Sequence, residues 1–469
     1  MIFALEPIYM SIVKPSIPKG TRDFSPVILS KRNYLKAKLI DAFENFGFQP
    51  IETPSFERSE TLLGKYGEEG DRLIFKILNS GEKVKNADLE ALKNGELVKF
   101  SDSLSQKALR YDLTVPFARY VAQNQNDIVF PFRRYQMQTV WRADRPQHAR
   151  FQEFLQCDAD VVGERSLWQE VEGVLLYDWV FSQLGLKGVK IHLNHRKILA
   201  GIAQFIGGES QLINFTVALD KLSKIGEKGV INELQSKGFS SDATERLRPF
   251  LSLKDDFQTQ LSFVTQALHD IEIAQEGIKE LKFICDQLDH HSLKTISLTF
   301  DVALARGLNY YTGLILEALP PLGVKMGSIG GGGRYDNLTD LFGLKNISGF
   351  GISFGFDRIF LILEELNLFP NTLDHKTRLL FLNFGDDSAG FCFDKLTKLR
   401  DLQFPCEFYP KPAKLKKQLN YANQRSIPYV VILGSDEMQK GNFVLKNMMT
   451  GAQVKHPIAQ MIEVLQKLI

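Results

Sequence analysis

The stretch FRRYQMQTVWRADRPQHARFQEFLQCDADVVG, Phe132–Gly163, contains the pattern that decides the fold of this chain. Apolar and polar residues alternate in RRYQMQTVWRAD and again in QEFLQCDADVVG, as they do in strands. The polar segment ADRPQHAR separates the two runs and is typical of a loop. The stretch therefore predicts two antiparallel strands joined by a polar loop.

Charged and aromatic residues of this hairpin suit a nucleotide. Arg142 ends the first strand, Arg145 and Arg150 lie in the loop, and Phe154 is on the returning strand. A guanidinium fork matches phosphate oxygens, and an aromatic ring stacks on a base. The alternative is a solvated basic hairpin with a phenylalanine in the core.

The segments before the hairpin predict one helix and one edge element. Apolar residues at helical spacing predict a long amphipathic helix from Ser25 to about Gly47. QPIETPSFE follows, and its two prolines, Pro50 and Pro54, favour a sheet edge or an interface over a central strand.

After the hairpin, the chain predicts a helical segment, a return to strands and a separate C-terminal domain. Residues 212–291 carry long helical patterns, and strands return at Ile296. GFGISFGFDRIFLILEEL then leads into a helix that ends near Asn367. From about residue 377, strands alternate with helices, which indicates a small α/β domain with a largely parallel sheet.

Further polar residues interrupt the apolar patterns. Asp112 and Thr114 stand just before a proline, and Gln156 and Asp160 occupy strand positions that favour apolar side chains. Two carboxylates can indicate glycosidase chemistry or a metal site, but neither has a second ligand at metal spacing, so we expect no metal held by protein ligands. Arg358 opposes the dipole of its helix, so we expect it to have a partner, either a ligand or a salt bridge.

Two more stretches contain candidate functional residues. FDVALARGLNYYTG, Phe300–Gly313, begins like a buried strand and then places Arg306, Tyr310 and Tyr311 where apolar residues would continue. GGGGRYD lacks the lysine and the Ser/Thr of a Walker A loop and does not fit GxGxxG in a βαβ unit. It is therefore only a weak indication of a phosphate loop.

Composition sets broad limits. The 469 residues, 44% hydrophobic and 24% charged, fit a globular protein of roughly two to four domains. The net charge of +2 neither requires nor excludes a nucleic-acid partner. The four cysteines are far apart and form no CxxC pair, which favours a reducing, cytoplasmic location over a disulfide framework. The apolar N-terminus is too short to span a membrane, so we expect no membrane partner.

The ordered set of motifs resembles the histidyl-tRNA synthetases, a family of class II aminoacyl-tRNA synthetases. KGTRDFSP is similar to the N-terminal signature of that family, GFQPIETPSFE to motif 1, Phe132–Gly163 to motif 2 and GFGISFGFDRI to motif 3. LARGLNYYTG is close to the histidine-specific RGLDYYTG stretch, although Asn309 stands where the family more often has Asp. LKKQLNYANQRSIPYVVILGSDE resembles the anticodon-binding domain.

The resemblance implies an α+β fold. It consists of a class II catalytic domain with a six-stranded, mainly antiparallel sheet, a helical insertion and a C-terminal α/β anticodon-binding domain. The implied boundaries are an N-terminal extension at 1–18, the first catalytic part at 19–210, the insertion at 211–292, the second catalytic part at 293–370 and the anticodon-binding domain at 377–469. A homodimer formed through motif 1 is also implied.

The implied activity is the ATP-dependent ligation of L-histidine to its transfer RNA, tRNA(His). Histidine and ATP form histidyl-adenylate and pyrophosphate, and the histidyl group then passes to the tRNA with release of AMP. Mg²⁺ is expected with ATP, although no cluster of carboxylates in the sequence indicates its ligands.

The resemblance also implies a role for each motif residue. In ATP binding, Arg142 would hold the α-phosphate, Arg150 and Arg358 would hold the outer phosphates, and Phe154 would stack on adenine. The implied catalytic residues are Arg306 and Arg142. The implied histidine-binding residues are Asp160, Tyr310 and Tyr311 around the imidazole, Asp112, Thr114 and Gln156 around the α-amino group, and Arg306. Arg145 and Gln147 would approach the acceptor end of the tRNA, and Lys414, Lys416 and Lys417 lie where the family reads the anticodon or, alternatively, form a solvated helix face.

A rival interpretation is a synthetase-like regulator that binds histidine and controls a phosphoribosyltransferase. Such proteins resemble the catalytic domain but typically lack the anticodon-binding domain. The presence of that domain and of the complete arginine set favours the enzyme.

Overall fold

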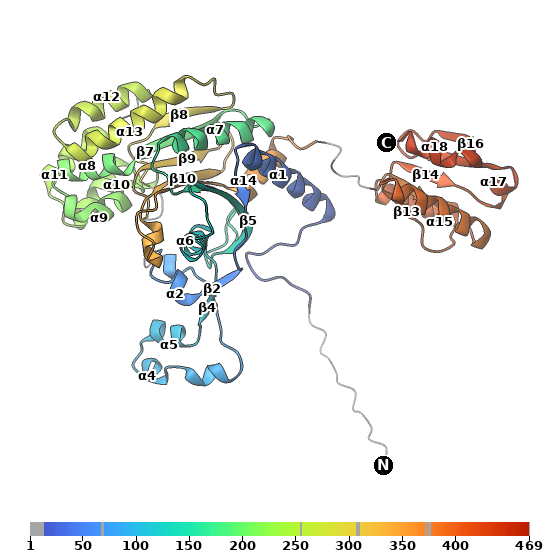
Figure 1. Ribbon diagram of the computed structural model, residues 1–469, viewed down its shortest axis with the longest axis horizontal. Coiled ribbons are helices and arrows are strands. Elements are labelled where there is room, and N and C mark those ends of the chain that lie inside the picture. The colour runs from blue at the N-terminus through green and yellow to red at the C-terminus, as the bar shows by residue number, and fades with distance from the viewer. Residues whose placement is uncertain are drawn as a thin grey trace, which may run out of the picture. The chain divides into compact units, whose positions relative to one another are not determined.

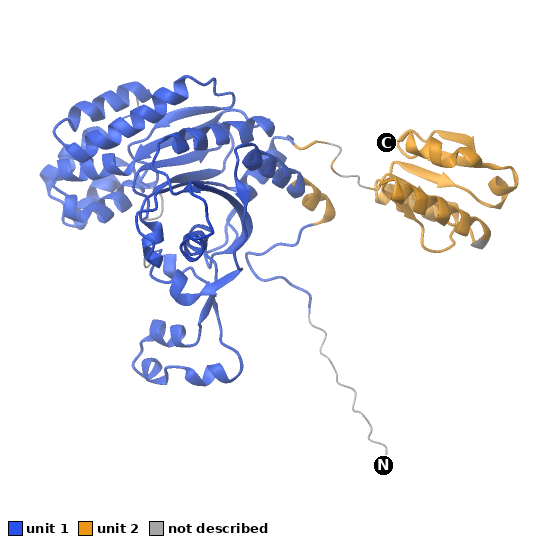
Figure 2. Cartoon of the chain, viewed as in Figure 1, with its two compact units in different colours: residues 1–24, 32–368 blue, residues 25–31, 369–469 orange. Residues whose placement is uncertain are grey.

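The computed structural model describes residues 14–66, 70–253, 256–305, 310–370, 373 and 377–468. The chain forms two compact units (Figure 2). One contains residues 1–24 and 32–368, and the other contains residues 25–31 and 369–469. Within the described residues, no helix combines the length and the apolar character needed to cross a membrane.

An eight-stranded sheet forms the centre of the first unit (Figure 1). Its strand order is β1-β5-β6-β11-β10-β9-β7-β8. The strands are β1 (Gln49–Pro50), β5 (Phe132–Trp141), β6 (Glu153–Val162), β7 (Val189–His195), β8 (Ile296–Phe300), β9 (Leu314–Leu319), β10 (Gly330–Tyr335) and β11 (Gly349–Phe354). The six strands from β5 to β7 are antiparallel to their neighbours, whereas β1 and β8 pair in parallel at the two edges. The expected six-stranded sheet thus has one extra strand at each edge.

Helices α1 (Pro26–Asn45), α7 (Trp168–Gln183) and α14 (Phe356–Glu365) pack on one face of this sheet. The predicted helix near residues 25–47 is confirmed as α1. Phe354 of β11 joins the layers, because its ring centroid lies 5.8 Å from that of Phe43 in α1 and 4.6 Å from that of Tyr177 in α7. All three side chains are buried. This face is therefore the apolar core, and the opposite face is available for polar side chains.

The glycine-rich run is a central strand and not a loop. β10 lies between β9 and β11, and a Cβ atom on Gly332 would stand 2.2 Å from the carbonyl oxygen of Gly351. The close approach of the two strands therefore requires glycine. Sequence patterns did not predict a strand here because glycine is depleted in strands.

A group of helices connects β7 to β8. Their bounds are α8 (Arg196–Phe205), η2 (Glu209–Gln211), α9 (Leu212–Leu219), α10 (Leu222–Ser236), α11 (Ser241–Leu251), α12 (Phe257–Ala267) and α13 (Glu272–Asp289). The helical pattern predicted for residues 212–291 is confirmed in the described part of that range. The domain boundaries at 211 and 292 stay a prediction.

A small three-stranded sheet, β2-β4-β3, carries a lobe of short helices (Figure 1). Its elements are β2 (Phe56–Arg58), α2 (Ser59–Leu62), β3 (Lys76–Ile77), η1 (Gly81–Asn86), α4 (Leu89–Lys93), α5 (Leu97–Ser103) and β4 (Lys107–Leu109). Helix α6 (Thr114–Gln123) follows, and η3 (Leu338–Phe342) lies between β10 and β11. The expectation of a sheet edge for QPIETPSFE is confirmed, since β1 is an edge strand.

The second unit contains a five-stranded sheet in the order β13-β12-β14-β15-β16. Its elements are β12 (Leu379–Phe381), α15 (Asp386–Asp401), β13 (Cys406–Phe408), α16 (Leu415–Gln424), β14 (Tyr429–Ile432), α17 (Ser435–Gln439), β15 (Asn442–Asn447), β16 (Gln453–Pro457), η5 (Ile458–Gln460) and α18 (Met461–Gln466). Strand β12 pairs in parallel with β13 and with β14. The pairs β14–β15 and β15–β16 are antiparallel, so the prediction of a largely parallel sheet was wrong for these two pairs. The short connection between β15 and β16 permits only an antiparallel pair.

Candidate functional site

A cavity of about 420 Å³ lies over the polar side of the large sheet. It gathers most of the residues that the sequence predicted for a site. Those that line it are Asp112, Thr114, Arg142, Arg150, Phe154, Gln156, Asp160, Tyr310, Tyr311 and Arg358.

Strand register explains why polar side chains collect here. In the β5–β6 pair, Arg134 stands opposite Asp160 and Gln136 stands opposite Asp158. Directly opposed residues of an antiparallel pair project from the same face, and alternate residues of one strand do so too. Arg134, Gln136, Asp158 and Asp160 therefore share one side of the sheet, and all four are buried.

Two glycines make room for this polar row. A Cβ atom on Gly351 would stand 2.0 Å from Oδ1 of Asp160, and one on Gly333 would stand 2.8 Å from Cδ1 of Tyr311. Any larger residue would push the carboxylate or the phenol out of place. The glycines of β10 and β11 therefore leave space above the sheet for the side chains of Tyr311 and Asp160.

The inner end of the cavity is acidic and rich in phenols. Tyr335 donates a hydrogen bond of 2.6 Å to Oδ1 of Asp160, and Nη2 of Arg134 lies 2.7 Å from Oδ2. Burial raises the pKa of Asp160, while Arg134 opposes this shift. Burial also raises the pKa of Tyr310 and of Tyr311, whose ring centroids are 4.9 Å apart. Both phenols are therefore neutral groups that can donate hydrogen bonds.

Asp112 reaches the same end from the segment before α6. Its Oδ1 accepts hydrogen bonds from the Tyr66 hydroxyl at 2.8 Å and from the Val115 amide at 3.2 Å. Its Oδ2 is buried and accepts no hydrogen bond from a described residue. Burial raises the pKa of Asp112.

Gln156 and Asp158 are joined by a hydrogen bond, and each has one oxygen that accepts none from a described residue. Nε2 of Gln156 donates to Oδ2 of Asp158 at 2.7 Å. Oε1 of Gln156 and Oδ1 of Asp158 are buried and accept no hydrogen bond within the described parts of the chain. Burial raises the pKa of Asp158 to about 7, although Arg134 and the neighbouring Ser353 hydroxyl oppose the shift.

Three arginines also line the cavity, namely Arg142, Arg150 and Arg358. Nε of Arg142 donates to the Tyr111 carbonyl at 3.1 Å, and its Cζ atom lies 5.2 Å from the ring centroid of Phe154. Nη1 of Arg358 donates to the Ser328 carbonyl at 2.6 Å. Arg150 is half exposed and forms an ion pair with Asp144. Arginines and an aromatic ring therefore line the same cavity, as a polyphosphate and a purine require.

A salt-bridge cluster at the first turn of α14 involves Asp357. Oδ1 of Asp357 lies 2.8 Å from Nη2 of Arg22 and 2.5 Å from Nη1 of Arg32. Arg22 belongs to KGTRDFSP, and its Cζ atom lies 3.3 Å from the ring centroid of Phe151. The N-terminal signature therefore braces both the loop of the hairpin and the helix that carries Arg358.

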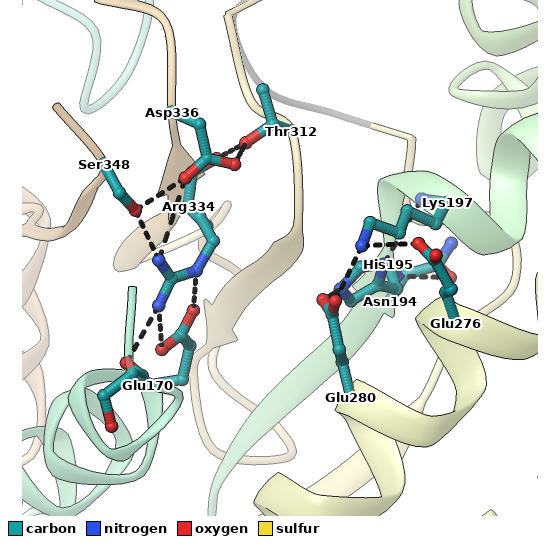
Figure 3. A network of polar contacts seen from close by, with 11 residues as sticks. Glu170, Asn194, His195, Lys197, Glu276, Glu280, Thr312, Arg334, Asp336 and Ser348 are labelled. Atoms are coloured by element: carbon teal, nitrogen blue, oxygen red, sulfur yellow. Dashed lines mark hydrogen bonds and ion pairs between the residues drawn. The ribbon is translucent and has the colours of Figure 1, made fainter. Parts of the chain in front are cut away.

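A buried network supports the tyrosine segment (Figure 3). Arg334 of β10 donates to both carboxylate oxygens of Glu170, at 2.5 and 2.8 Å, and to Oγ of Ser348 at 2.6 Å. Oγ1 of Thr312 donates to Asp336 at 2.5 Å, and Ser348 donates to the same carboxylate at 2.6 Å. Because Thr312 follows Tyr311 directly, this network fixes the tyrosines to β10 and α7.

A second cluster in the same view ties α8 to α13 (Figure 3). Nε2 of the buried His195 lies 2.9 Å from Glu280, and Nζ of Lys197 lies 2.6 Å from Glu280 and 3.0 Å from Glu276. Burial lowers the pKa of His195, although Glu280 opposes this shift.

Some predicted residues lie elsewhere. Arg145 and Gln147 are exposed on the hairpin loop and do not line the cavity. Arg306 and Asn309 lie outside the described residues. In the second unit, Lys414, Lys416 and Lys417 are exposed at the start of α16.

Sequence reasoning missed several residues of the acidic end. These are Tyr66, Arg134, Asp158 and Tyr335. Asp158 and Arg134 could have been found, because they continue the two-residue spacing of Gln156 and Asp160 on paired strands. Tyr66 and Tyr335 carried no comparable signal.

Comparisons with known proteins agree with the motif order. A family model described as histidyl-tRNA synthetase matches residues 20–85 and 80–359, and one described as an anticodon binding domain matches residues 382–468. The histidine–tRNA ligase of Christiangramia forsetii is 58% identical over 440 residues, covering 94% of this chain and 96% of that protein. The histidine–tRNA ligase of Flavobacterium johnsoniae is 55% identical and covers 94% of this chain and 97% of its own length. The crystal structure of histidyl-tRNA synthetase from Nostoc sp. PCC 7120 superposes with a TM-score of 0.78 at 29% identity, covering 98% of this chain and 100% of that one.

Proposed function

The chain belongs to the histidyl-tRNA synthetase family, and from this premise we propose that it is a histidine–tRNA ligase. It would join L-histidine to tRNA(His) with ATP, through a histidyl-adenylate. The observation that carries the proposal is the cavity, whose lining combines arginines and a phenylalanine with acids and phenols.

Adenylate formation needs alignment and positive charge and no general base. A carboxylate oxygen of histidine attacks the α-phosphorus of ATP, and pyrophosphate leaves with the electron pair of the broken P–O bond. Arg142 would hold the α-phosphate, Arg150 and Arg358 the outer phosphates, and Phe154 would stack on adenine. Loss of one such donor in a water-poor site costs on the order of 3 kcal/mol, about a hundredfold in rate. Arg306, outside the described residues, is proposed as the catalytic arginine on resemblance alone.

The acidic end suits an imidazole, which donates at one nitrogen and accepts at the other. Tyr310 and Tyr311 are neutral phenols that can donate, and Asp160 retains lone pairs that can accept. Asp112, Thr114 and Gln156 would face the α-amino group. An amino acid without these groups would leave buried polar atoms unpaired and would be rejected strongly.

We also propose that Mg²⁺ enters bound to ATP. Magnesium keeps several waters and usually binds through one or two carboxylates together with substrate phosphates. Among the described residues, no group of three or more His, Cys, Asp or Glu side chains could hold a metal ion by itself. Asp144 and Glu317 line the cavity and would supply carboxylate oxygens to it. The bound ion would neutralise charge on the polyphosphate.

The chain is proposed to act as a cytoplasmic homodimer. The resemblance to motif 1 assigns the dimer contact to the segment around β2, and Phe56 of β2 is 47% exposed in the single chain. Arg145 and Gln147 on the exposed hairpin loop are proposed to approach the acceptor end of the tRNA. Light scattering after size-exclusion chromatography tests the oligomeric state.

Histidine-dependent exchange between ATP and pyrophosphate tests the central proposal. The wild-type chain should exchange label only when histidine is present, and Arg142→Ala and Arg306→Ala should each lose about a hundredfold in rate. Arg306→Ala should still bind histidine. Arg248→Ala is the matched control, because Arg248 lies in α11 away from the cavity and pairs with Glu227 and Glu245. A folded wild-type chain without exchange would instead favour the histidine-binding regulator.

A further inference from the structure

Among the cavity-lining residues, three buried acceptor atoms have neither a hydrogen bond nor an ion pair with a described residue: Oδ2 of Asp112, Oε1 of Gln156 and Oδ1 of Asp158. Oδ2 of Asp160 also accepts no hydrogen bond, but it forms an ion pair with Arg134. Buried acceptors left unpaired are costly, so such a group indicates a position at which a ligand supplies donors.

In each of these side chains, a hydrogen bond to the second polar atom fixes the orientation of the unpaired oxygen. Oδ1 of Asp112 is held by Tyr66 and by the Val115 amide. When Asp158 is ionised, as it is above about pH 7, the amide of Gln156 points its nitrogen at Oδ2 of Asp158, because the reversed amide would set two oxygens against each other. Oε1 of Gln156 and Oδ1 of Asp158 therefore remain for the ligand.

The chemistry of the trio selects its ligand. Three acceptors, two of them carboxylate oxygens, match a group that has three donors, no acceptor and a positive charge. A primary ammonium has these properties. Asp160 does not belong to the trio, because Tyr335 donates to its Oδ1 and its Oδ2, although without a hydrogen bond, is neutralised by the guanidinium of Arg134 at 2.7 Å.

We propose that Asp158 binds the α-ammonium group of the substrate histidine directly, as a third acceptor beside Asp112 and Gln156. This inference rests on the proposed function, and it adds a residue that the motif resemblance did not assign. Asp158 also positions Gln156, because its second oxygen holds the amide nitrogen. Its net effect would be discrimination in favour of ligands that carry an ammonium group.

Ligand binding to Asp158→Asn tests the contact. Asparagine keeps an oxygen that can accept from Gln156, so the variant removes mainly the negative charge. Titration calorimetry with histidine and with histamine should give dissociation constants about 10- to 100-fold higher in the variant than in the wild type. Imidazolepropionate lacks the ammonium group, and it should bind the variant as well as or better than the wild type.

Asp160→Asn is the matched control, because it removes a neighbouring charge that is proposed to face the imidazole. It should weaken histidine and imidazolepropionate alike. Binding of imidazolepropionate by Asp158→Asn also demonstrates an intact cavity. Should that variant not fold, Asp158→Ser provides a neutral oxygen for the same titrations.

The possible outcomes distinguish a failure of the proposed function from a failure of the proposed contact with Asp158. A folded wild-type chain that binds no histidine would overturn the proposed function, and this inference with it. Wild-type binding with unchanged affinity in Asp158→Asn would overturn this inference alone. Equal losses for histidine and imidazolepropionate in that variant would also overturn it, because the lost contact would then not involve the ammonium group.

Discussion

At the scale of single residues, the absence of a side chain is as important to this site as its charged groups. Gly351→Ala would place a Cβ atom 2.0 Å from Oδ1 of Asp160, so the carboxylate or the strand must move. We expect a loss of about 1–3 kcal/mol in the free energy of unfolding and weaker histidine binding, measured by thermal unfolding and by titration. Gly390→Ala is the control, because nothing lies within 4 Å of its added Cβ atom in α15. Equal behaviour of the two variants would contradict the prediction.

The raised pKa of Asp158, about 7, has a measurable consequence for stability. In the unfolded chain this carboxyl loses its proton near pH 4, whereas in the folded chain it keeps the proton up to about pH 7. The folded state therefore binds more protons between these values, and its stability falls as pH rises through the window, by on the order of 2–4 kcal/mol. Asp158→Asn lacks this contribution, so its melting temperature relative to the wild type should be higher at pH 8 than at pH 5.

Several charged and titratable groups surround Asp158. They are Asp112, Arg134, Asp160, Tyr177 and Tyr311. For that reason the prediction concerns the difference in melting temperature between Asp158→Asn and the wild type. Their own titration is present in both chains and largely cancels. A constant difference in melting temperature between pH 5 and pH 8 would mean that Asp158 is ionised throughout.

At the scale of elements, the buried ion pair between Arg334 and Glu170 joins β10 to α7. Arg334 is 5% exposed and Glu170 is fully buried, so removal of one partner leaves an uncompensated charge. We expect Arg334→Met and Glu170→Leu each to cost about 3–5 kcal/mol in the free energy of unfolding. The double variant should be more stable than either single one, and thermal unfolding of all four chains measures this. Additive losses would show that the two side chains act independently.

Element prediction from the sequence succeeded where side chains alternate. β5 and β6 were predicted because their apolar and polar residues follow the two-residue period, and α1 because of its helical spacing. β10 was missed because glycine gives no period, and the lobe with α4 and α5 was missed because its helices have only a few residues each. The stretch beginning at Phe300 was expected to start as a strand, but β8 ends at that residue.

Site prediction shows the same limit. Arg142, Gln156, Asp160 and Tyr311 were found because they lie in stretches with recognisable motifs. The hydroxyl of Tyr335 reaches Asp160 only because β10 and β6 both pair with β11, a contact between residues 175 positions apart. No local pattern encodes such a contact, so it required the fold.

At the scale of the whole molecule, the cavity and the anticodon-binding domain lie in separate compact units. Every residue that lines the cavity lies between Tyr111 and Arg358, in the first unit. We expect a chain truncated after residue 370 to keep histidine-dependent pyrophosphate exchange within about tenfold and to lose most transfer of histidine to tRNA. Exchange and aminoacylation assays on the same preparation measure this. Loss of exchange in a folded truncated chain would contradict it.

The order of residues along β6 has one more consequence. Phe154, Gln156, Asp158 and Asp160 all line the cavity, and alternate residues of a strand stand about 6.6 Å apart. Free histidine is a zwitterion, and a reversed molecule would place its carboxylate among three acids and its ring beside the arginines. If histidine binds as proposed, electrostatic repulsion would favour the orientation with the carboxylate toward Arg142. The single strand β6 would then set the direction in which the amino acid lies.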